Sequence, residues 1–444
     1  MNKEFHKKQN FFSFSDIDSE RKDRIMKFTS TEATPAPHVP PGVLRLTGAA
    51  KEDIPMYRIQ TMNKISPVGL NRFPSELYEV GDAVQDPQGI LVRSAKLLDL
   101  EFNPSLLAIA RAGVGVNNIP LDRCAAAGIP VFSTPGANAN AVKELVICAM
   151  LMGSRDIPGA IRWVREQAAS GADVSTVVEK GKSAFIGPEL YKKTLGIIGL
   201  GAIGSIVANT AISLGMDVYG YDPFLSVDTA LRLDRHVHVV KDINDLYKRS
   251  NYITMHIHYT EKTAHMIDAS AIAAMKRGVR VINLARGEIV DDEAMLTALD
   301  TGMVAAYITD FPNNRLLTAP HVIAMPHLGA STPESEQNCA AMAVDTLRDY
   351  LESGNIRSSV NLPEMTMDRS GVQRLCVLHK NVPGMLANIT SLFGRDGVNV
   401  ENLSNKSRGD YAYTMVDLGS KVGDNVIEDV HRTANVIRVR SLEW

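Results

Sequence analysis

A glycine-rich turn between two apolar segments is the feature that most constrains how this chain can fold. Residues 195–198 form a short apolar run that leads directly into Gly199, Gly201 and Gly204. Gly199 permits a tight turn from strand to helix, Gly201 lets the backbone approach a phosphate, and Gly204 allows the helix to pack closely on the strand. Residues 205–214 follow with the apolar spacing of a helix. The turn therefore predicts a βαβ unit that holds a dinucleotide at the start of a helix.

An acidic residue follows at the distance that such a unit requires. Residues 216–221 are typical of a second strand, which ends at Asp222, 23 residues after Gly199. The carboxylate can accept hydrogen bonds from ribose hydroxyls and would repel a 2′-phosphate, so it favours NAD over NADP. The strand, the helix and the acid together distinguish this turn from an ordinary glycine-rich loop.

Length and composition are those of an ordinary globular protein with more than one domain. The chain has 444 residues, too many for one core, of which 45% are hydrophobic and 22% are charged. A net charge of −3 leaves no basic excess, which argues against a nucleic-acid partner, and no apolar run is long enough to suggest a membrane partner. The four cysteines have neither CxxC nor zinc-site spacing, so we expect reduced, buried thiols, no metal site and a cytoplasmic protein.

Composition and periodicity divide the chain into segments. Residues 1–41 are polar and then rich in Thr and Pro, and we expect a flexible tail. Alternating apolar strands and helical segments predict two doubly wound parallel sheets, a substrate-binding domain of residues 42–142 and 315–353 and an NAD-binding Rossmann domain of residues 143–314. Residues 371–444 have the ferredoxin-like order βαββαβ. The predicted fold class is therefore α/β with a small C-terminal unit.

Two polar side chains follow predicted strands, at the sheet edge where a nicotinamide would lie. Arg286 follows the apolar segment 281–285, and His327 follows another apolar segment. A 2-hydroxy acid needs a cation for its oxygens, a base for its hydroxyl proton and a hydride acceptor. The forked guanidinium suits a carboxylate, and a histidine can take a proton near neutral pH. Because arginines after strands usually form surface ion pairs and histidines beside proline usually lie in plain loops, spacing alone leaves both interpretations open.

These two residues belong to a wider set of motifs that continues to the end of the chain. The motifs are VRSA at 92–95, RAGVG at 111–115, the glycine turn, NLARG at 283–287 and PHLGAST at 326–332. With them the chain resembles the D-isomer-specific 2-hydroxyacid dehydrogenases. The resemblance implies that Arg286 binds and polarises the substrate and that His327 is the catalytic acid/base.

The same resemblance implies further contacts. The substrate would be held by Arg93, Ser94 and Asn138, with Arg111 or Lys64 as further candidates for its anionic groups. The NAD site would be lined by Gly199, Gly201, Ala202, Ile203, Gly204, Asp222, Leu284, Ala285, Asp310 and Gly329.

The chain departs from the family pattern at one position. The family usually carries a glutamate five residues after the aspartate that matches Asp310, and this glutamate pairs with the catalytic histidine. Here that position is Arg315. Either Asp310 takes over as the carboxylate partner, or His327 works unpaired. We expect Asp310 to stay with the nicotinamide amide.

The C-terminal unit resembles ACT domains, which pair across subunits and bind amino acids at a turn between strand and helix. The turn here is HKNVPG at 379–384, and in most proteins such a turn needs no ligand to explain it. The resemblance implies that serine, as a feedback inhibitor, would be held by His379, Asn381 and Asn399.

Together these resemblances imply a function in amino-acid biosynthesis. The expected reaction is NAD-dependent oxidation of D-3-phosphoglycerate to 3-phosphohydroxypyruvate, the first step of serine synthesis, by a homodimer or homotetramer. One alternative is a dehydrogenase of another D-2-hydroxy acid. Another is a catalytically inactive NAD-binding sensor, which the missing glutamate keeps open.

Overall fold

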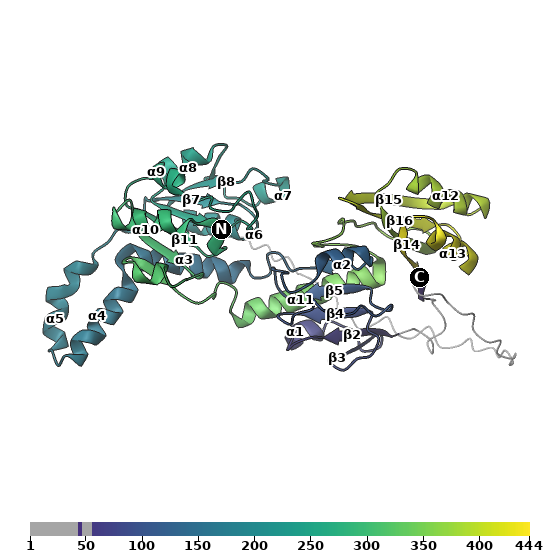
Figure 1. The fold of residues 1–444 in the computed structure, drawn as a ribbon, viewed down its shortest axis with the longest axis horizontal. Coiled ribbons are helices and arrows are strands. Elements are labelled where there is room, and N and C mark those ends of the chain that lie inside the picture. The colour runs from purple at the N-terminus through teal and green to yellow at the C-terminus, as the bar shows by residue number, and fades with distance from the viewer. Residues whose placement is uncertain (1–42, 47–55) are drawn as a thin grey trace, which may run out of the picture. The chain divides into compact units, whose positions relative to one another are not determined.

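The computed structural model describes residues 43–46 and 56–444, so the expected tail at 1–41 lies outside the described residues. The described elements form two parallel sheets and one mainly antiparallel sheet (Figure 1). The predicted fold class is confirmed. In the described part of the chain, no helix is both long enough and apolar enough to cross a bilayer.

The nucleotide-binding sheet has seven parallel strands in the order β13-β12-β11-β10-β7-β8-β9. The strands are β7 (Thr194–Ile198), β8 (Asp217–Tyr221), β9 (His238–Val240), β10 (Tyr252–Met255), β11 (Val279–Asn283), β12 (Val304–Thr309) and β13 (Val322–Ala324). One face packs on α3 (Ala139–Arg155) and α6 (Ala202–Ser213), and the other packs on α8 (Ile243–Arg249), α9 (Ala269–Ala273) and α10 (Asp292–Asp300). The strand order reverses at β7, which places a ligand crevice beside the glycine turn.

The position of β13 differs from the expected domain boundary. This strand lies within residues 315–353, which we assigned to the substrate-binding domain, but it pairs with β12 in the nucleotide-binding sheet. The pairing has a structural consequence, because it brings the segment that carries His327 to the same sheet edge as Asp310, which follows β12.

The N-terminal parallel sheet has five strands in the order β3-β2-β4-β5-β6. They are β2 (Tyr57–Thr61), β3 (Tyr78–Gly81), β4 (Gly89–Val92), β5 (Ala108–Arg111) and β6 (Val131–Phe132), accompanied by α1 (Pro67–Leu70), α2 (Leu121–Ala126) and α11 (Pro333–Ser353). Helix α11 buries Ala340, Val344 and Leu347 in the same core as Ile59 and Leu91. The chain therefore leaves this sheet before α3 and returns to it with α11.

The C-terminal sheet contains the expected βαββαβ order. Its elements are β14 (Gln373–Lys380), α12 (Met385–Arg395), β15 (Val400–Arg408), β16 (Tyr411–Leu418), α13 (Asp424–Arg432) and β17 (Val436–Glu443). A fifth strand, β1 (Val43–Leu46), pairs in parallel with β17. We expected residues from 42 onward to join the substrate-binding domain. The pairing gives the backbone groups along the edge of β17 a partner, which an edge strand otherwise lacks.

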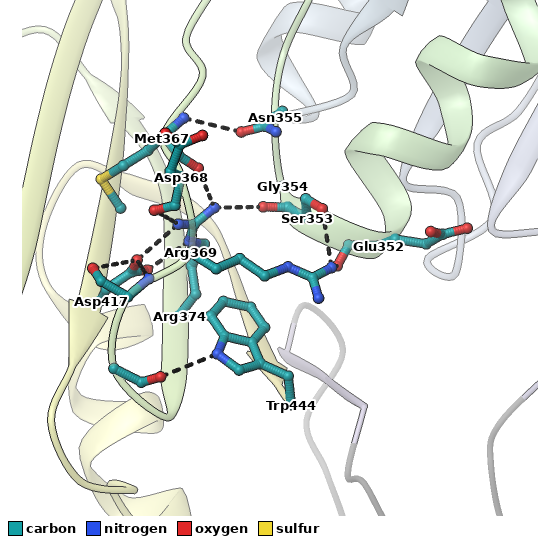
Figure 2. A network of polar contacts seen from close by, with 12 residues as sticks. Glu352, Ser353, Gly354, Asn355, Met367, Asp368, Arg369, Arg374, Asp417 and Trp444 are labelled. Carbon is teal, nitrogen blue, oxygen red and sulfur yellow. Dashed lines mark hydrogen bonds and ion pairs between the residues drawn. The ribbon is translucent and has the colours of Figure 1, made fainter. Parts of the chain in front are cut away.

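Side chains from the C-terminal segment cap the end of α11 (Figure 2). Successive backbone carbonyls from Tyr350 to Gly354 accept hydrogen bonds from Arg440, Arg369, Arg374 and Tyr413. The last carbonyls of a helix have no partner within the helix and carry partial negative charge, so guanidinium groups stabilise them. The end of α11 is thereby fastened to the C-terminal sheet.

The remaining elements are short or peripheral. They are α4 (Ile157–Ala169), α5 (Val174–Gly181), α7 (Val227–Ala230) and the 3-10 turns η1 (Lys182–Phe185), η2 (Gly287–Ile289) and η3 (Leu316–Thr318). All four cysteines are free thiols; three are buried as expected, whereas Cys148 is exposed.

Candidate active site

The glycine turn has the geometry that its sequence predicts. Gly199 has a φ of +90°, and a Cβ there would lie 2.6 Å from the carbonyl oxygen of His256. A Cβ at Gly204 would lie 1.9 Å from the carbonyl oxygen of Gly199, whereas one at Gly201 would meet nothing within 4 Å. The first and last glycines are therefore required by packing, and the middle one faces open space where a phosphate can approach.

The start of α6 fits a dinucleotide. The helix begins at Ala202, and no side chain caps its N-terminus, so its first N–H groups remain available to a phosphate. Asp222 lies just after β8, where its two carboxylate oxygens accept hydrogen bonds from the N–H groups of Leu200 and Phe224, both at 2.9 Å. The side chain of Ile203 is partly buried and packs against the hydrophobic core on one face of the nucleotide-binding sheet. The residues present thus suit a pyrophosphate and a ribose.

Three charged or titratable side chains follow three neighbouring strands. Arg286 comes after β11, Asp310 after β12 and His327 after β13, and these strands are adjacent and parallel. Asp310 is only 1% exposed, and its Oδ2 accepts a hydrogen bond from the N–H of Gly329 at 3.3 Å. Burial raises the pKa of Asp310, and the nearby charges of His327 and Arg286 oppose that shift only in part. The aspartate, the histidine and the arginine therefore form one electrostatic cluster.

The ring of Phe311, a residue that we did not predict, lies near both Arg286 and His327. The rings of Phe311 and His327 have centroids 4.6 Å apart, and the guanidinium carbon of Arg286 lies 5.7 Å from the centroid of the Phe311 ring. Asn283 holds the backbone of Arg286 in place, because its amide nitrogen donates to the carbonyl of Arg286 at 2.8 Å. The only sequence signal for Phe311 is its position directly after Asp310.

A second histidine, His256, lies beside the glycine turn and is a poor proton acceptor. Burial lowers the pKa of His256 to about 4, so this imidazole is neutral and weakly basic at neutral pH. Its Nε2 lies 3.2 Å from the hydroxyl of Thr254. His327, by contrast, is exposed at the strand ends, where a substrate can reach it.

Arg93 and Arg111 bring two more cations to the site. Arg93 follows β4, and Arg111 ends β5 and donates from Nε to the carbonyl of Arg93 at 3.0 Å. Burial lowers the pKa of Arg111, and the charges of Arg286 and Arg93 lower it further. A Cβ at Gly115 would lie 3.4 Å from Nη2 of Arg286, so the RAGVG loop meets this arginine. Three guanidinium groups therefore gather where one substrate could contact them.

The other expected substrate residues flank this group. Asn138 precedes α3 without capping it by a side-chain hydrogen bond, and its buried Oδ1 has no partner among the described residues. Ser94 is exposed, and its N–H donates to Oδ1 of Asn63, which also accepts from the N–H groups of Arg93 and Ala95. Asn63, which we did not predict, thus shapes the loop that carries Arg93. Lys64 is exposed next to it.

The expected effector residues lie on the C-terminal sheet and its turns. His379 is 2% exposed, and its two ring nitrogens lie 2.8 Å from the carbonyl of Lys380 and 2.9 Å from the hydroxyl of Thr414. Asn381 and Asn399 are exposed, and their amides donate to the carbonyl of Gly409 and to Glu401. The two asparagines are accessible to a small ligand, whereas His379 is already bonded within the sheet.

Comparison with known proteins shows the family. Residues 147–329 match the model of the D-isomer specific 2-hydroxyacid dehydrogenase, NAD binding domain. A D-3-phosphoglycerate dehydrogenase of Haemophilus influenzae is 31% identical over 379 residues, which cover 82% of this chain and 88% of that protein. One of Synechocystis is 35% identical over 326 residues, but the match covers only 56% of that longer protein. The chain belongs to the D-isomer-specific 2-hydroxyacid dehydrogenase family, and it has the family's NAD-binding domain.

Solved structures agree on the fold. The NAD⁺-bound 3-phosphoglycerate dehydrogenase of Entamoeba histolytica has a TM-score of 0.53 at 26% identity, with 69% of this chain and 99% of that chain covered. The D-mandelate dehydrogenase of Rhodotorula graminis has a TM-score of 0.58 at 20% identity, with 71% and 100% covered, and supports the fold alone. The chain spans little more than half the length of several relatives, at 56%, 55% and 60%.

Proposed function

We propose that this protein catalyses the NAD-dependent oxidation of D-3-phosphoglycerate to 3-phosphohydroxypyruvate, the first step of serine synthesis. The observation that carries the proposal is the cluster of Arg93, Arg111 and Arg286, of which Arg286 lies at the same strand ends of the nucleotide-binding sheet as His327. A substrate with a phosphate at one end and a carboxylate at the other needs several cations, and guanidinium groups bind both anions through paired hydrogen bonds. Relatives named D-3-phosphoglycerate dehydrogenase support the same substrate.

The residues have distinct tasks in this reaction. A bound NAD supplies the hydride acceptor. Arg286 binds the substrate carboxylate and stabilises charge on the carbinol oxygen, and His327 removes the hydroxyl proton. The nearby carboxylate of Asp310 favours the imidazolium that forms. The interaction of Asp310 with His327 leads us to propose, in place of our expectation that Asp310 stays with the nicotinamide amide, that Asp310 is the carboxylate that supports His327.

The direct test is formation of NADH by the purified protein with D-3-phosphoglycerate, followed through its absorbance. We expect turnover with NAD and much less with NADP, because Asp222 faces the position of a 2′-phosphate. Turnover only with another D-2-hydroxy acid would replace the proposed substrate. No turnover with any hydroxy acid would leave the NAD-binding sensor as the better description. Adding serine to the same assay tests feedback inhibition separately, since unchanged turnover would remove only the regulatory part.

Asp310→Asn is expected to lower kcat roughly tenfold or more while making the fold more stable at pH 7. Because burial raises the pKa of Asp310 in the folded state, its contribution to stability is fully present below the ordinary pKa of aspartate. That contribution is lost as the pH rises through the folded-state pKa. The asparagine amide cannot ionise, so the variant avoids the cost of burying a charged carboxylate at neutral pH. Denaturant unfolding at pH 7 and at pH 4 measures the gain in the free energy of unfolding, and this gain should be smaller at pH 4. Near-normal turnover would exclude an essential carboxylate here.

Regulation, assembly and location complete the proposal. We infer that serine is held by Asn381 in the turn after β14, by Asn399 just before β15 and by His379, and that the C-terminal unit acts as an ACT domain. We infer a homodimer, or a homotetramer made of two such dimers; exposed apolar side chains on α3, on α4 and just after η1, namely Leu151, Ile161 and Ile186, support an interface. Free thiols at all four cysteines are typical of a cytoplasmic protein.

A further inference from the structure

One of the three arginines in the site already has a carboxylate partner. Nη2 of Arg93 lies 2.5 Å from Oε1 of Glu336, and the two side chains are 43% and 44% exposed. In the described part of the chain, the guanidinium groups of Arg111 and Arg286 form no ion pair with an acidic residue. They donate instead to the carbonyls of Arg93 and Ala285. Of these three arginines, Arg93 is therefore the one whose guanidinium an incoming anion would have to share with an acidic side chain.

The segment that carries His327 also supplies Glu336. After His327 the chain turns through Ser331, whose hydroxyl donates to the carbonyl of His327 at 3.4 Å. Thr332 then caps α11 by accepting the N–H of Ser335 at 3.1 Å. Glu336 lies in the first turn of this helix. The cap fixes the start of α11 and with it the position of Glu336. The backbone segment that carries His327 therefore also places the Glu336 carboxylate against the loop after β4.

We propose that Glu336 is a built-in competitor for the Arg93 guanidinium, which an anionic ligand must displace in order to bind. This inference rests on the proposed function for the identity of the ligand, which is a phosphorylated hydroxy acid. The carboxylate has the same charge as the substrate groups, and it occupies Nη2 of Arg93, one of the donors that they would use. Glu336 therefore sets the affinity of the site for anions, and it does so without touching the reacting atoms.

The test compares Glu336→Gln with the wild type. Because a half-exposed ion pair is weak, the variant should bind D-3-phosphoglycerate roughly two- to fivefold more tightly. KM should fall by that factor while kcat stays unchanged, since Glu336 does not contact the groups that transfer the proton. Isothermal titration with D-3-phosphoglycerate, and with inorganic phosphate as a second probe, measures the same gain without any need for turnover.

Glu334→Gln is the matched control. Glu334 lies in the same first turn of α11 and is also exposed, and among the described residues it forms no ion pair. Both substitutions remove one negative charge from the positive end of the same helix, so any general effect on the helix is equal. We expect the affinity for both anions to be unchanged in this variant.

Several results would overturn the inference. An unchanged or raised KM in Glu336→Gln would show that Glu336 does not compete with the substrate, and an equal gain in Glu334→Gln would reduce the effect to net charge. Failure of the proposed function looks different. If the wild type does not turn over D-3-phosphoglycerate but Glu336→Gln still binds anions more tightly, the proposed reaction is wrong and the role of Glu336 as a competitor stands. If neither the wild type nor Glu336→Gln binds D-3-phosphoglycerate or inorganic phosphate, the proposed reaction and the competitor role of Glu336 are both wrong.

Discussion

His327→Asn is expected to lower kcat by roughly 10²- to 10⁴-fold and to leave the binding of NAD unchanged. The imidazole follows β13 and lies at the same sheet edge as Asp310 and Arg286, where it can take the hydroxyl proton as the hydride leaves. The amide of asparagine keeps a polar group at this position but cannot accept that proton. Single-turnover formation of NADH measures the loss, and the quenching of protein fluorescence by NAD measures cofactor binding.

His321→Asn is the matched control for this substitution. His321 is an exposed histidine just before β13, with a φ of +65°, a conformation that asparagine adopts readily. Its backbone carbonyl accepts the N–H of Tyr307, and this bond does not depend on the side chain. We expect full activity for His321→Asn. Retention of more than about a tenth of wild-type kcat by His327→Asn would mean that another group takes the proton, because general-base catalysis contributes more than that.

The parts of the site that sequence reasoning reached are those carried by local structure. The glycine turn, its strand, its helix and Asp222 lie within about 30 residues, the length of one βαβ unit, so their roles can be read without the fold. Arg286 and His327 were reachable because residues just after parallel strands meet at one sheet edge. The family motifs then assigned their roles.

The parts that it missed depend on distant contacts. Arg93 and Glu336 are 243 positions apart, and only the packing of α11 on the N-terminal sheet brings them together. The pairing of β1 with β17 joins opposite ends of the chain. Phe311 is an ordinary aromatic residue until β12 and β13 place its ring against His327. Such contacts follow from tertiary structure, on which propensity and local spacing carry no information.

Arg374→Met is expected to lower the free energy of unfolding by about 3–5 kcal/mol, the usual cost of breaking a buried ion pair by removing one partner. Arg374 and Asp417 are both fully buried and form a bidentate pair at 2.5 and 2.7 Å (Figure 2). The substitution leaves the charge of Asp417 with only the N–H and hydroxyl of Ser370 as partners. It also removes the donor to the carbonyl of Ser353 at the end of α11. Urea denaturation measures the change.

Arg72→Met separates the effect of burial from that of pairing. Arg72 and Asp345 form the same bidentate contact, at 2.7 and 2.6 Å, but their side chains are 48% and 45% exposed. We expect this control to cost much less than Arg374→Met, because solvent-exposed ion pairs contribute little to stability. An equal cost for both variants would mean that burial of the Arg374 pair adds nothing. The double variant Arg374→Met/Asp417→Leu should recover part of the loss, because it leaves no charge unpaired. Any loss that remains then reports the bonds from Arg374 to the carbonyls of Ser353, Met367 and Asp368, the first of which fastens the end of α11.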